Sequence, residues 1–569
     1  MLIHEKGQVM KVANSSNQLE NRLARVLGIT GLASTLIISP EFNIDPINWI
    51  KLLVLSTGVG ISSVYFFQMK KNHHISRFFI VLSVIVGIQI AFTQAPVQEI
   101  IWGVHGRAMG LLTWFCLLLM AWQSSMIKDP LFLETVLIYF RRACLLTFLY
   151  MIIQTLKLDP IEWQISEPFA FLGNINYSSA LMGVFVAGIL PYFASTQLHT
   201  KFSIGFLCLC ILGLVSSTNS LQGIFMTTFA AVILLSSRLM KRVKQEIAVS
   251  FLVLQAFCMS AFLILISWPT FLGGVFFQET MAFRRDYWTA AINMAKTHPF
   301  GVGPDGYGNY YREFRSLEAV LRTESSRVSN SAHSIFLDVM ANFGFLIALV
   351  FLFFIVYMLI IVCKNLVCEK SFNNLSISLM WLAFLPQFII GIANIGTMVW
   401  FAIFSGFVLS TYSTRTFSKS VEIGEEKGSS IMTLIGFRVL QRPIQNTASN
   451  FLAVTLLGSV GFIIAAPPMI ADHQVLDSEK RGDIQSIHEI VTHSWGTSTY
   501  LHERLIQTAT IRADGDSALS FAQESVRYNE RSYYSWKVIS ELRVSTPEQR
   551  ESAIARLNGL DPNNPLDSR

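Results

Sequence analysis

The run FLIALVFLFFIVYMLIIV at residues 345–362 contains no charged residue, and a mostly apolar stretch, in which Asp338 is the one charged residue, extends it back to residue 334. About 20 apolar residues in a helix are enough to cross the hydrocarbon core of a bilayer. Similar runs recur along the chain, which is 52% hydrophobic and 14% charged, whereas soluble domains have about 25% charged residues. The sequence therefore predicts an all-α, polytopic membrane bundle.

Apolar runs of this kind predict about 12 to 13 transmembrane helices. Arg141 and Arg142 interrupt the fifth of these spans, and the twelfth is short. The spans centre on residues 24–40, 47–68, 77–93, 108–126, 138–156, 178–195, 202–217, 222–237, 248–269, 334–362, 374–393, 397–412 and 448–466.

Lysine and arginine gather in alternate connections between the spans, and cytoplasmic connections are the ones that accumulate positive charge. This alternation predicts a cytoplasmic N-terminus (1–23) and a multi-pass protein of the cytoplasmic (inner) membrane. The first 25 residues lack the basic-then-apolar order of a cleaved signal peptide, so we expect the first span to direct insertion. The clustered residues are Lys70, Lys71, Arg77, Lys128, Arg141, Arg142, Lys201, Arg238, Lys241, Arg242, Lys244, Lys364, Lys370, Arg415, Lys419, Arg438 and Arg442.

The distribution of charge argues against nucleic-acid binding, and the positions of the cysteines argue against disulfide and zinc sites outside the membrane. The net charge of +6 comes from short clusters between apolar runs, which argues against nucleic-acid binding. All seven cysteines lie in or beside apolar runs. Neither a disulfide framework nor a cysteine-based zinc site is therefore expected in the long loop or the tail.

One outer connection, residues 273–333, is about 60 residues long, and a loop of that length within a compact bundle is usually functional. It breaks the depletion of positive charge seen in the other outer connections, which indicates a need for guanidinium groups. Its basic residues are Arg284, Arg285, Lys296, Arg312, Arg315, Arg322 and Arg327.

The composition changes at Ala466-Pro467-Pro468, so residues 24–466 are predicted to form the membrane domain and residues 467–569 an extracytoplasmic, soluble helical tail. Two amphipathic stretches in the tail, 517–528 and 547–557, are followed by Asn529 and by Asp561-Pro562-Asn563, which stand about 33 residues apart, a tetratricopeptide-like period. A plain amphipathic helical tail is the alternative.

The order of short motifs in the outer segments is more specific than any one of them. The long loop reads FRRDYW at 283–288, HPFGVGPDGY at 298–307 and SAHS at 331–334, followed by a span interrupted by Asn342-Phe343-Gly344. Two shorter outer segments read WGVHGR at 102–107 and FLGNINY at 171–177. Over residues 90–410 this order resembles the O-antigen ligase and Wzy-type O-antigen polymerase superfamily, and the tail resembles helical repeats that some members append.

The resemblance implies a metal-independent glycosyltransferase that needs no cofactor. Such an enzyme takes a glycan from a polyprenyl (undecaprenyl) diphosphate carrier at the outer membrane face and joins it to the hydroxyl of a glycan, lipid or protein acceptor. Arginine suits a diphosphate leaving group because its planar fork is always charged. Arg284 and Arg285 are the expected diphosphate contacts, with anchoring to lipid head groups as the alternative.

His333 stands where the family places a histidine that activates the acceptor hydroxyl or helps to bind the donor. An ordinary histidine pKa near 6.5 suits a general base at neutral pH. The alternative is a histidine that only caps the next helix.

Four further residues at the outer ends of spans are candidates for binding the donor's sugar or phosphate groups: Arg107, Asn174, Asn176 and Gln222. Each could instead cap a helix. The sequence departs from the family at Leu221, where many members have arginine, so Gln222, Arg107 or a loop arginine would have to replace it.

Several functions remain open at this stage. Ligation to a lipid A core, polymerisation of repeat units, and O-linked transfer to protein share the same donor chemistry. A polysaccharide or lipid transporter (flippase) and a scaffold that recruits proteins through the tail are the non-enzymatic alternatives. The sequence contains no Walker A motif, no HExxH motif and no outer Asp/Glu pair like the metal site of other membrane oligosaccharyltransferases.

Overall fold

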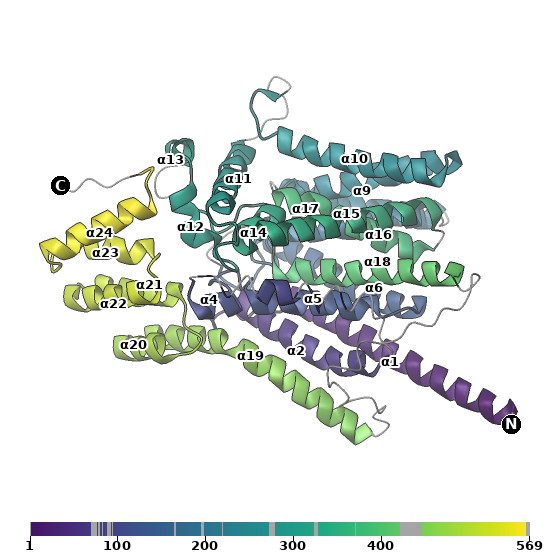
Figure 1. Cartoon of the computed structure of the whole chain (residues 1–569), viewed down its shortest axis with the longest axis horizontal. Helices are drawn as coiled ribbons and strands as arrows, with labels where there is room; N and C mark the ends of the chain where they lie inside the picture. The colour runs from purple at the N-terminus through teal and green to yellow at the C-terminus, as the bar shows by residue number, and fades with distance from the viewer. Residues whose placement is uncertain are drawn as a thin grey trace.

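The computed structural model describes residues 2–564, except for 70–76, 78–79, 82, 88–90, 92, 94, 164–166, 195–197, 219, 272–278, 324–327, 370 and 421–446. All regular structure within these limits is helical. Most helices form one elongated bundle, and the part of the chain after residue 466, which contains the end of one long helix and the last five helices, forms a tail beyond one end of it (Figure 1).

The long apolar helices build the bundle. In chain order they are α1 (Leu2–Leu36), α2 (Asn48–Gln68), α5 (Leu111–Ser125), α6 (Pro130–Thr155), α7 (Ile175–Ile189), α8 (Leu198–Ser217), α9 (Gln222–Leu239), α10 (Gln245–Leu265), α15 (Phe345–Cys368), α16 (Phe372–Ala383), α17 (Leu385–Ile390), α18 (Ile395–Ser420) and α19 (Thr447–Arg481), with 3-10 turns η1 (Leu190–Ala194) and η2 (Met240–Arg242).

Shorter helices lie at one end of this bundle or in the tail. Those at the end of the bundle are α4 (Val97–Trp102), α11 (Glu279–Thr297), α12 (Tyr307–Phe314), α13 (Leu317–Thr323) and α14 (Ile335–Phe343). Those of the tail are α20 (Ile484–His493), α21 (Thr499–Ile511), α22 (Gly515–Tyr528), α23 (Tyr533–Glu541) and α24 (Pro547–Leu560).

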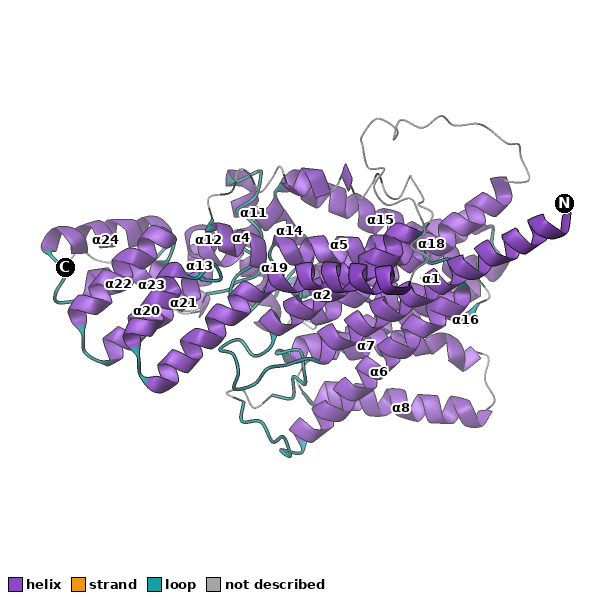
Figure 2. Ribbon diagram, turned by 90° about the horizontal axis from the view of Figure 1, so that it is seen from below, coloured by secondary structure: helices purple, strands orange, loops and turns teal. Residues whose placement is uncertain are grey.

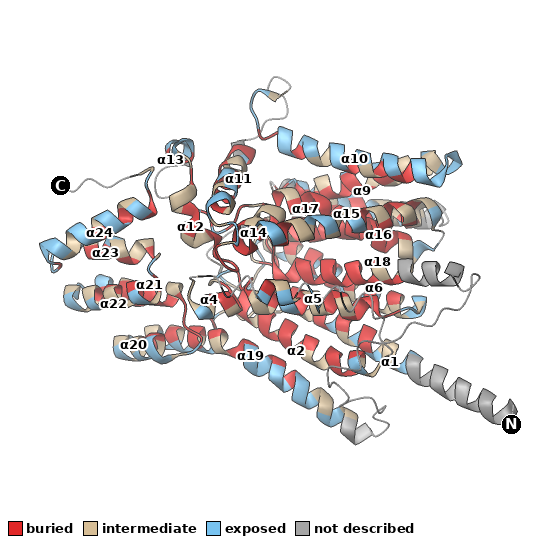
Figure 3. Cartoon of the chain, viewed as in Figure 1, coloured by how far each residue is buried: buried red, intermediate tan, exposed pale blue. Residues whose placement is uncertain are grey.

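The prediction of an all-α polytopic membrane bundle is confirmed. Within the described residues, eight helical segments are long and apolar enough to cross a membrane, and three shorter apolar helices accompany them. Exposed apolar side chains cover the outer faces of α10 and α19, where lipid would contact them (Figure 3). Much of the span predicted at 77–93 lies outside the described residues.

Two predicted spans are broken in the structure. The run 334–362 is divided into α14 and α15 at Gly344, whose φ of +87° is a left-handed conformation that favours glycine. The run 374–393 is divided into α16 and α17, and Pro386 stands at the start of α17, where its missing N–H costs nothing. Apolar residues continue across both breaks, which is why the sequence predicted one span in each run; the interruption of the first at Asn342-Phe343-Gly344 was already visible in the sequence.

The last span passes without a break into the tail, although the sequence predicted a boundary at Pro467 and Pro468. Both prolines lie inside α19. Proline at 468 cannot donate to the carbonyl of Ile464. That carbonyl instead accepts the indole N–H of Trp102 at 2.8 Å, so the helix loses no buried hydrogen bond there.

Helix α19 packs closely on α2 because glycines remove the side chains between them. A Cβ at Gly461 would lie 2.3 Å from the carbonyl oxygen of Ser56, and one at Gly60 would lie 2.2 Å from that of Leu457. Small residues of this kind let membrane helices approach backbone to backbone. The base of the tail is thereby fixed to the bundle.

The long loop, the segments 38–47 and 103–110, and the tail all gather at one end of the bundle, called the loop end here (Figures 1 and 2). Among the described connections, those that carry Lys128 and Lys241, Arg242 and Lys244 lie at the other end, together with the first part of α1 (Figure 1). The carboxylate of Glu20 in α1, for example, accepts the backbone N–H of Lys128 at 3.1 Å. The side of the membrane that each end faces stays a prediction.

Candidate active site

The glycine-rich segment at 298–307 folds around the C-terminal end of α14. Val302 and Gly303 donate their N–H groups to the carbonyls of Ala341 and Asn342, both at 2.9 Å. These bonds satisfy carbonyls that the end of a helix leaves free. Gly301 has a φ of +90°, and a Cβ there would lie 2.4 Å from the Asn342 carbonyl oxygen. Glycine is therefore required for the backbones to approach this closely.

Asp305 joins this segment to the segment 103–110. Its Oδ2 accepts the N–H groups of Val104 and Met109 at 3.0 and 3.2 Å. Its Oδ1 lies 2.8 Å from Nε of Arg107. The carboxylate thus fixes both the backbone and the side chain of the segment that carries Arg107.

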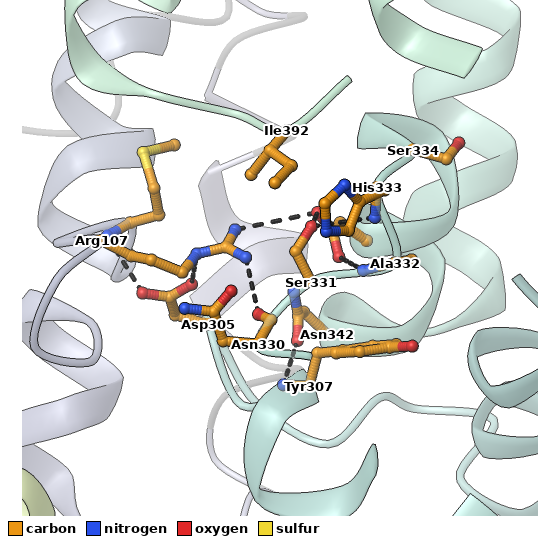
Figure 4. Close-up of polar contacts among 12 residues, drawn as sticks. Arg107, Asp305, Tyr307, Asn330, Ser331, Ala332, His333, Ser334, Asn342 and Ile392 are labelled. Carbon is orange, nitrogen blue, oxygen red and sulfur yellow. Dashed lines mark hydrogen bonds and ion pairs between the residues drawn. The ribbon is translucent and has the colours of Figure 1, made fainter. Parts of the chain in front are cut away.

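Arg107 is buried and contacts three parts of the loop end (Figure 4). Besides its ion pair with Asp305, its Nη1 donates to the carbonyl of Asn330 at 2.6 Å, and its Nη2 lies 3.7 Å from the carboxylate of Asp338. Asp338 in turn accepts the Ser331 hydroxyl at 2.6 Å and the Ala332 N–H at 2.7 Å. Two carboxylates therefore already compensate the charge of Arg107.

His333 follows directly in this network and has a strained backbone. Its φ is +52°, a conformation that costs of order 1–3 kcal/mol and is concentrated at functional sites. Its N–H donates to the Ser331 hydroxyl at 3.1 Å, and its ring stacks on Tyr287 with centroids 5.0 Å apart. The residue that caps α14 is Ser334, whose hydroxyl accepts the Leu337 N–H, so capping does not explain His333.

The imidazole of His333 is neutral at physiological pH. Burial lowers its pKa to about 3, and the positive charges of Arg284 and Arg107 add to this effect. The loss of water disfavours the charged ring, and so do two nearby guanidinium groups. The ring can therefore accept a proton or a hydrogen bond at one nitrogen.

Arg284 lies in α11, one turn before Tyr287. Burial lowers the pKa of its guanidinium. Its Nη1 donates a hydrogen bond to the sulfur of Met281 at 3.0 Å. In contrast to Arg107, it makes no ion pair with a carboxylate among the described residues. A partly buried guanidinium without a counter-ion is favourable to an incoming anion.

Arg285 points to a different environment. Its guanidinium lies over the ring of Trp268, 5.7 Å from the centroid, just beyond the end of α10. The positive charges that act on His333 are those of Arg284 and Arg107. The structure thus brings Arg107, Arg284 and His333 together, and it places Arg285 where anchoring at the membrane surface is the simpler interpretation.

The remaining sequence candidates lie at the starts of α7 and α9. Asn174 caps α7, accepting the N–H of Asn176 at 2.8 Å, and the side chain of Asn176 accepts the Ser220 hydroxyl at 2.8 Å. Gln222 is buried, and its Nε2 has no hydrogen-bond partner within the described residues. Its amide faces Gly391, beside the break between α17 and α18, where a Cβ would lie 2.9 Å from Nε2.

Sequence reasoning missed Asp305, Asp338 and Tyr287 as site residues. Asp338 stands in the first turn of α14, where acidic residues are favoured by the helix dipole, so its presence there looked ordinary. One signal could have pointed to the two aspartates. Arg107 stands at the end of a predicted span, where burial is expected, and a buried arginine needs carboxylate partners.

An apolar cavity of about 100 Å³ lies within the bundle next to this network. It is formed by α5, α14, α15 and α18, and Phe343 at its wall adjoins Asn342 in the chain. Its lining includes Trp114, Phe343, Ile347, Phe351, Met398 and Phe401.

Residues 205–353 match the family model described as O-antigen ligase. The match runs from α8 into α15 and contains Arg284, Asp305 and His333, but neither Arg107 nor the tail. The chain matches no curated protein. The tetratricopeptide-like character of the tail is not confirmed by these comparisons.

Proposed function

From the match of residues 205–353 to the O-antigen ligase family we propose that the chain is a membrane glycosyltransferase of that family. In this proposal the glycan leaves a polyprenyl diphosphate carrier and is joined to a hydroxyl of an acceptor. The loop end faces the outer side of the cytoplasmic membrane. No metal or cofactor takes part.

The observation that carries the proposal is the guanidinium of Arg284, which forms no ion pair with a carboxylate in the described structure and lies one helical turn from Tyr287, the residue on which His333 stacks. Breaking the glycosidic bond leaves negative charge on the diphosphate. Arg284 supplies a fixed positive charge where that anion forms, and such preorganised charge stabilises the transition state more than the ground state.

Arg107 has a supporting role in this proposal, since Asp305 and Asp338 already balance its charge. It holds the loop segments that present His333. Asn176 and Gln222 lie at neighbouring span ends and are proposed to contact the sugar. The apolar cavity next to Asn342 provides a surface for part of the carrier's hydrocarbon chain.

His333 is proposed to accept the proton, or a hydrogen bond, of the attacking hydroxyl. With a pKa of about 3 the free ring is a weak base. A diphosphate bound at Arg284 would offset the positive charge that depresses this pKa, because an anion favours the imidazolium form. Donor binding would therefore raise the basicity of His333 at the moment when the acceptor must be activated.

This chemistry is shared by ligation to lipid, polymerisation of repeat units, and transfer to serine or threonine of a protein. A transporter is the competing class, because broken spans such as α14/α15 and α16/α17 also occur in transporters. In this chain both breaks adjoin the candidate active site. The hydroxyl of Ser334, which caps α14, donates to the carbonyl of Phe388 in α17 at 2.9 Å and so connects the two broken spans.

A reconstituted reaction tests the proposal. The purified protein is mixed with a polyprenyl diphosphate glycan, a chelator, and in parallel a lipid, a glycan and a peptide acceptor. We expect covalent transfer of the glycan to one of them. Absence of product with all three acceptors, together with movement of the intact carrier across vesicles, would identify a transporter instead.

The depressed pKa of His333 predicts an unusual pH profile. The neutral ring is the active form, so activity is lost only as the pH falls through the folded pKa. With that pKa about 3, kcat/KM for the donor should change less than about twofold between pH 5.5 and 8. A histidine with pKa near 6.5 would lose about tenfold over this range. A sigmoidal fall centred near pH 6.5 would contradict the assignment.

A further inference from the structure

The end of the tail forms a buried ion pair with the long loop. Nε of Arg315 donates to Oδ1 of Asp561 at 3.1 Å, and its Nη2 pairs with Oδ2 of the same carboxylate. Both side chains are fully buried. Nη1 of Arg312 adds a third contact at 3.3 Å, and the amide of Asn563 donates to the Arg315 carbonyl at 2.6 Å.

A second set of contacts interlocks the same two regions. Arg531, between α22 and α23, pairs with Glu313 of α12, and its guanidinium lies 3.5 Å from the centroid of the Tyr310 ring. In the reverse direction, Arg312 of α12 lies 4.0 Å from the centroid of the Tyr533 ring in the tail. Charged hydrogen bonds and stacked guanidinium groups both fix orientation as well as distance. Figure 1 shows α12 between the tail and helices α11 and α14.

Helix α12 connects these contacts to the candidate active site. Arg315 follows its last residue, and Tyr307 is its first residue, about 12 Å away at 1.5 Å per residue. The N–H of Tyr307 donates to the side chain of Asn342 at 2.9 Å, and its hydroxyl donates to the carbonyl of Tyr287 at 2.8 Å. Tyr287 is the residue on which His333 stacks.

The other end of the tail is also fixed to the site. Asp472 of α19 lies 2.9 Å from Nε2 of His105, two residues before Arg107, and accepts the N–H of Asp45 at 3.0 Å. The tail therefore contacts both segments that carry the site, one through α19 and one through α24. An apolar contact would stabilise the attachment of the tail at least as much as a buried ion pair does, but it would fix the orientation of the two regions less definitely.

From this arrangement we propose that the tail is a clamp that sets the position of α12 and thereby of the Tyr287–His333 pair, with Asp561 as a positioning residue. This inference rests on the proposed function and extends it to a part of the chain outside the matched family segment. Asp561 acts through Arg315 and α12 and does not touch the substrate.

The test compares two tail variants in the reconstituted transfer reaction. Asp561→Ala should lower kcat about ten- to a hundredfold, since a displacement near 1 Å can have that effect on a reacting pair. The matched control is Glu479→Ala, which breaks a two-bond pair with Arg504 inside the tail, at 2.9 and 2.6 Å, without contacting the loop. The control should keep kcat within about threefold of wild type. Equal losses in the two variants would overturn the proposal in favour of general tail stability.

Conservative and double variants separate positioning from folding. Asp561→Glu keeps the charge and should recover activity relative to Asp561→Ala. Arg315→Ala combined with Asp561→Ala should lose little more than either single variant, because both remove one shared contact. Multiplied losses in the double variant would show that the pair does not act as a unit and would overturn the proposal.

Hydrogen exchange provides a readout that does not depend on activity. In Asp561→Ala, amides of α12 and α14 should exchange faster while those of α2 and α16 remain protected. If wild-type protein transfers no glycan, the proposed function fails but this exchange pattern still tests the clamp. Unchanged exchange in α12 and α14 would overturn the clamp even in an active enzyme.

Discussion

Replacing His333 by alanine should reduce glycan transfer by about 10²- to 10⁴-fold, the usual contribution of a positioned general acid or base. The ring stacks on Tyr287 and lies in the field of Arg284 and Arg107, none of which accepts a proton at neutral pH, and the nearby carboxylate of Asp338 already accepts the Ser331 hydroxyl and the Ala332 N–H. The measurement is initial rate of product formation at saturating donor. Membrane insertion and thermal unfolding should remain close to wild type.

Two variants control for the strained backbone at this position. His333→Asn tolerates the left-handed conformation and should be as inactive as His333→Ala. His298→Ala removes another imidazole of the same loop, which packs on Tyr310 and Phe314, and should retain most activity. Full activity in His333→Ala would remove His333 from the mechanism.

Arg284→Ala is expected to reduce transfer by about 10²- to 10³-fold, as does loss of one preorganised group that stabilises developing negative charge. Arg284→Lys should recover only part of this loss, since lysine keeps the charge but not the planar fork. Initial rates at varied donor concentration separate an effect on binding from one on catalysis.

The neighbouring arginine discriminates between the two sequence candidates. Arg285→Ala removes the same chemical group one residue away, where it lies over Trp268. The rate of glycan transfer in this variant should stay within about threefold of wild type, because surface anchoring is distributed over many residues. The reverse order of effects would assign the diphosphate to Arg285 and would make Arg284 a packing residue.

Much of the fold could be predicted from apolar periodicity, because the position of a span depends mainly on local hydrophobicity. The breaks could be predicted only in part, because the sequence marked the interruption at residues 342–344 but not the contact that accompanies it. Gly344 has a positive φ because the segment 298–303 lies against it, and a Cβ there would lie 2.5 Å from the Pro299 carbonyl oxygen. That contact joins residues more than forty positions apart, and no local pattern records it.

The loop arginines illustrate the same limit at the site. Their number drew attention to the loop, but the sequence could not show which charges are already balanced. Arg312 and Arg315 pair with Asp561, and Arg322 pairs with Asp286 at 3.0 Å. Arg284, in contrast, pairs with no carboxylate among the described residues, and its positive charge acts on His333. Only the tertiary contacts distinguish these roles.

The uninterrupted course of α19 through Pro467 and Pro468 has a consequence for chimeras and insertions. An α-helix turns about 100° and rises 1.5 Å with each residue. One extra residue after Met469 would therefore rotate everything beyond it by that angle, and Asp561 would no longer face Arg315. A tail exchanged between related proteins must therefore preserve the helical phase at this junction, because the last span and the start of the tail are one continuous helix.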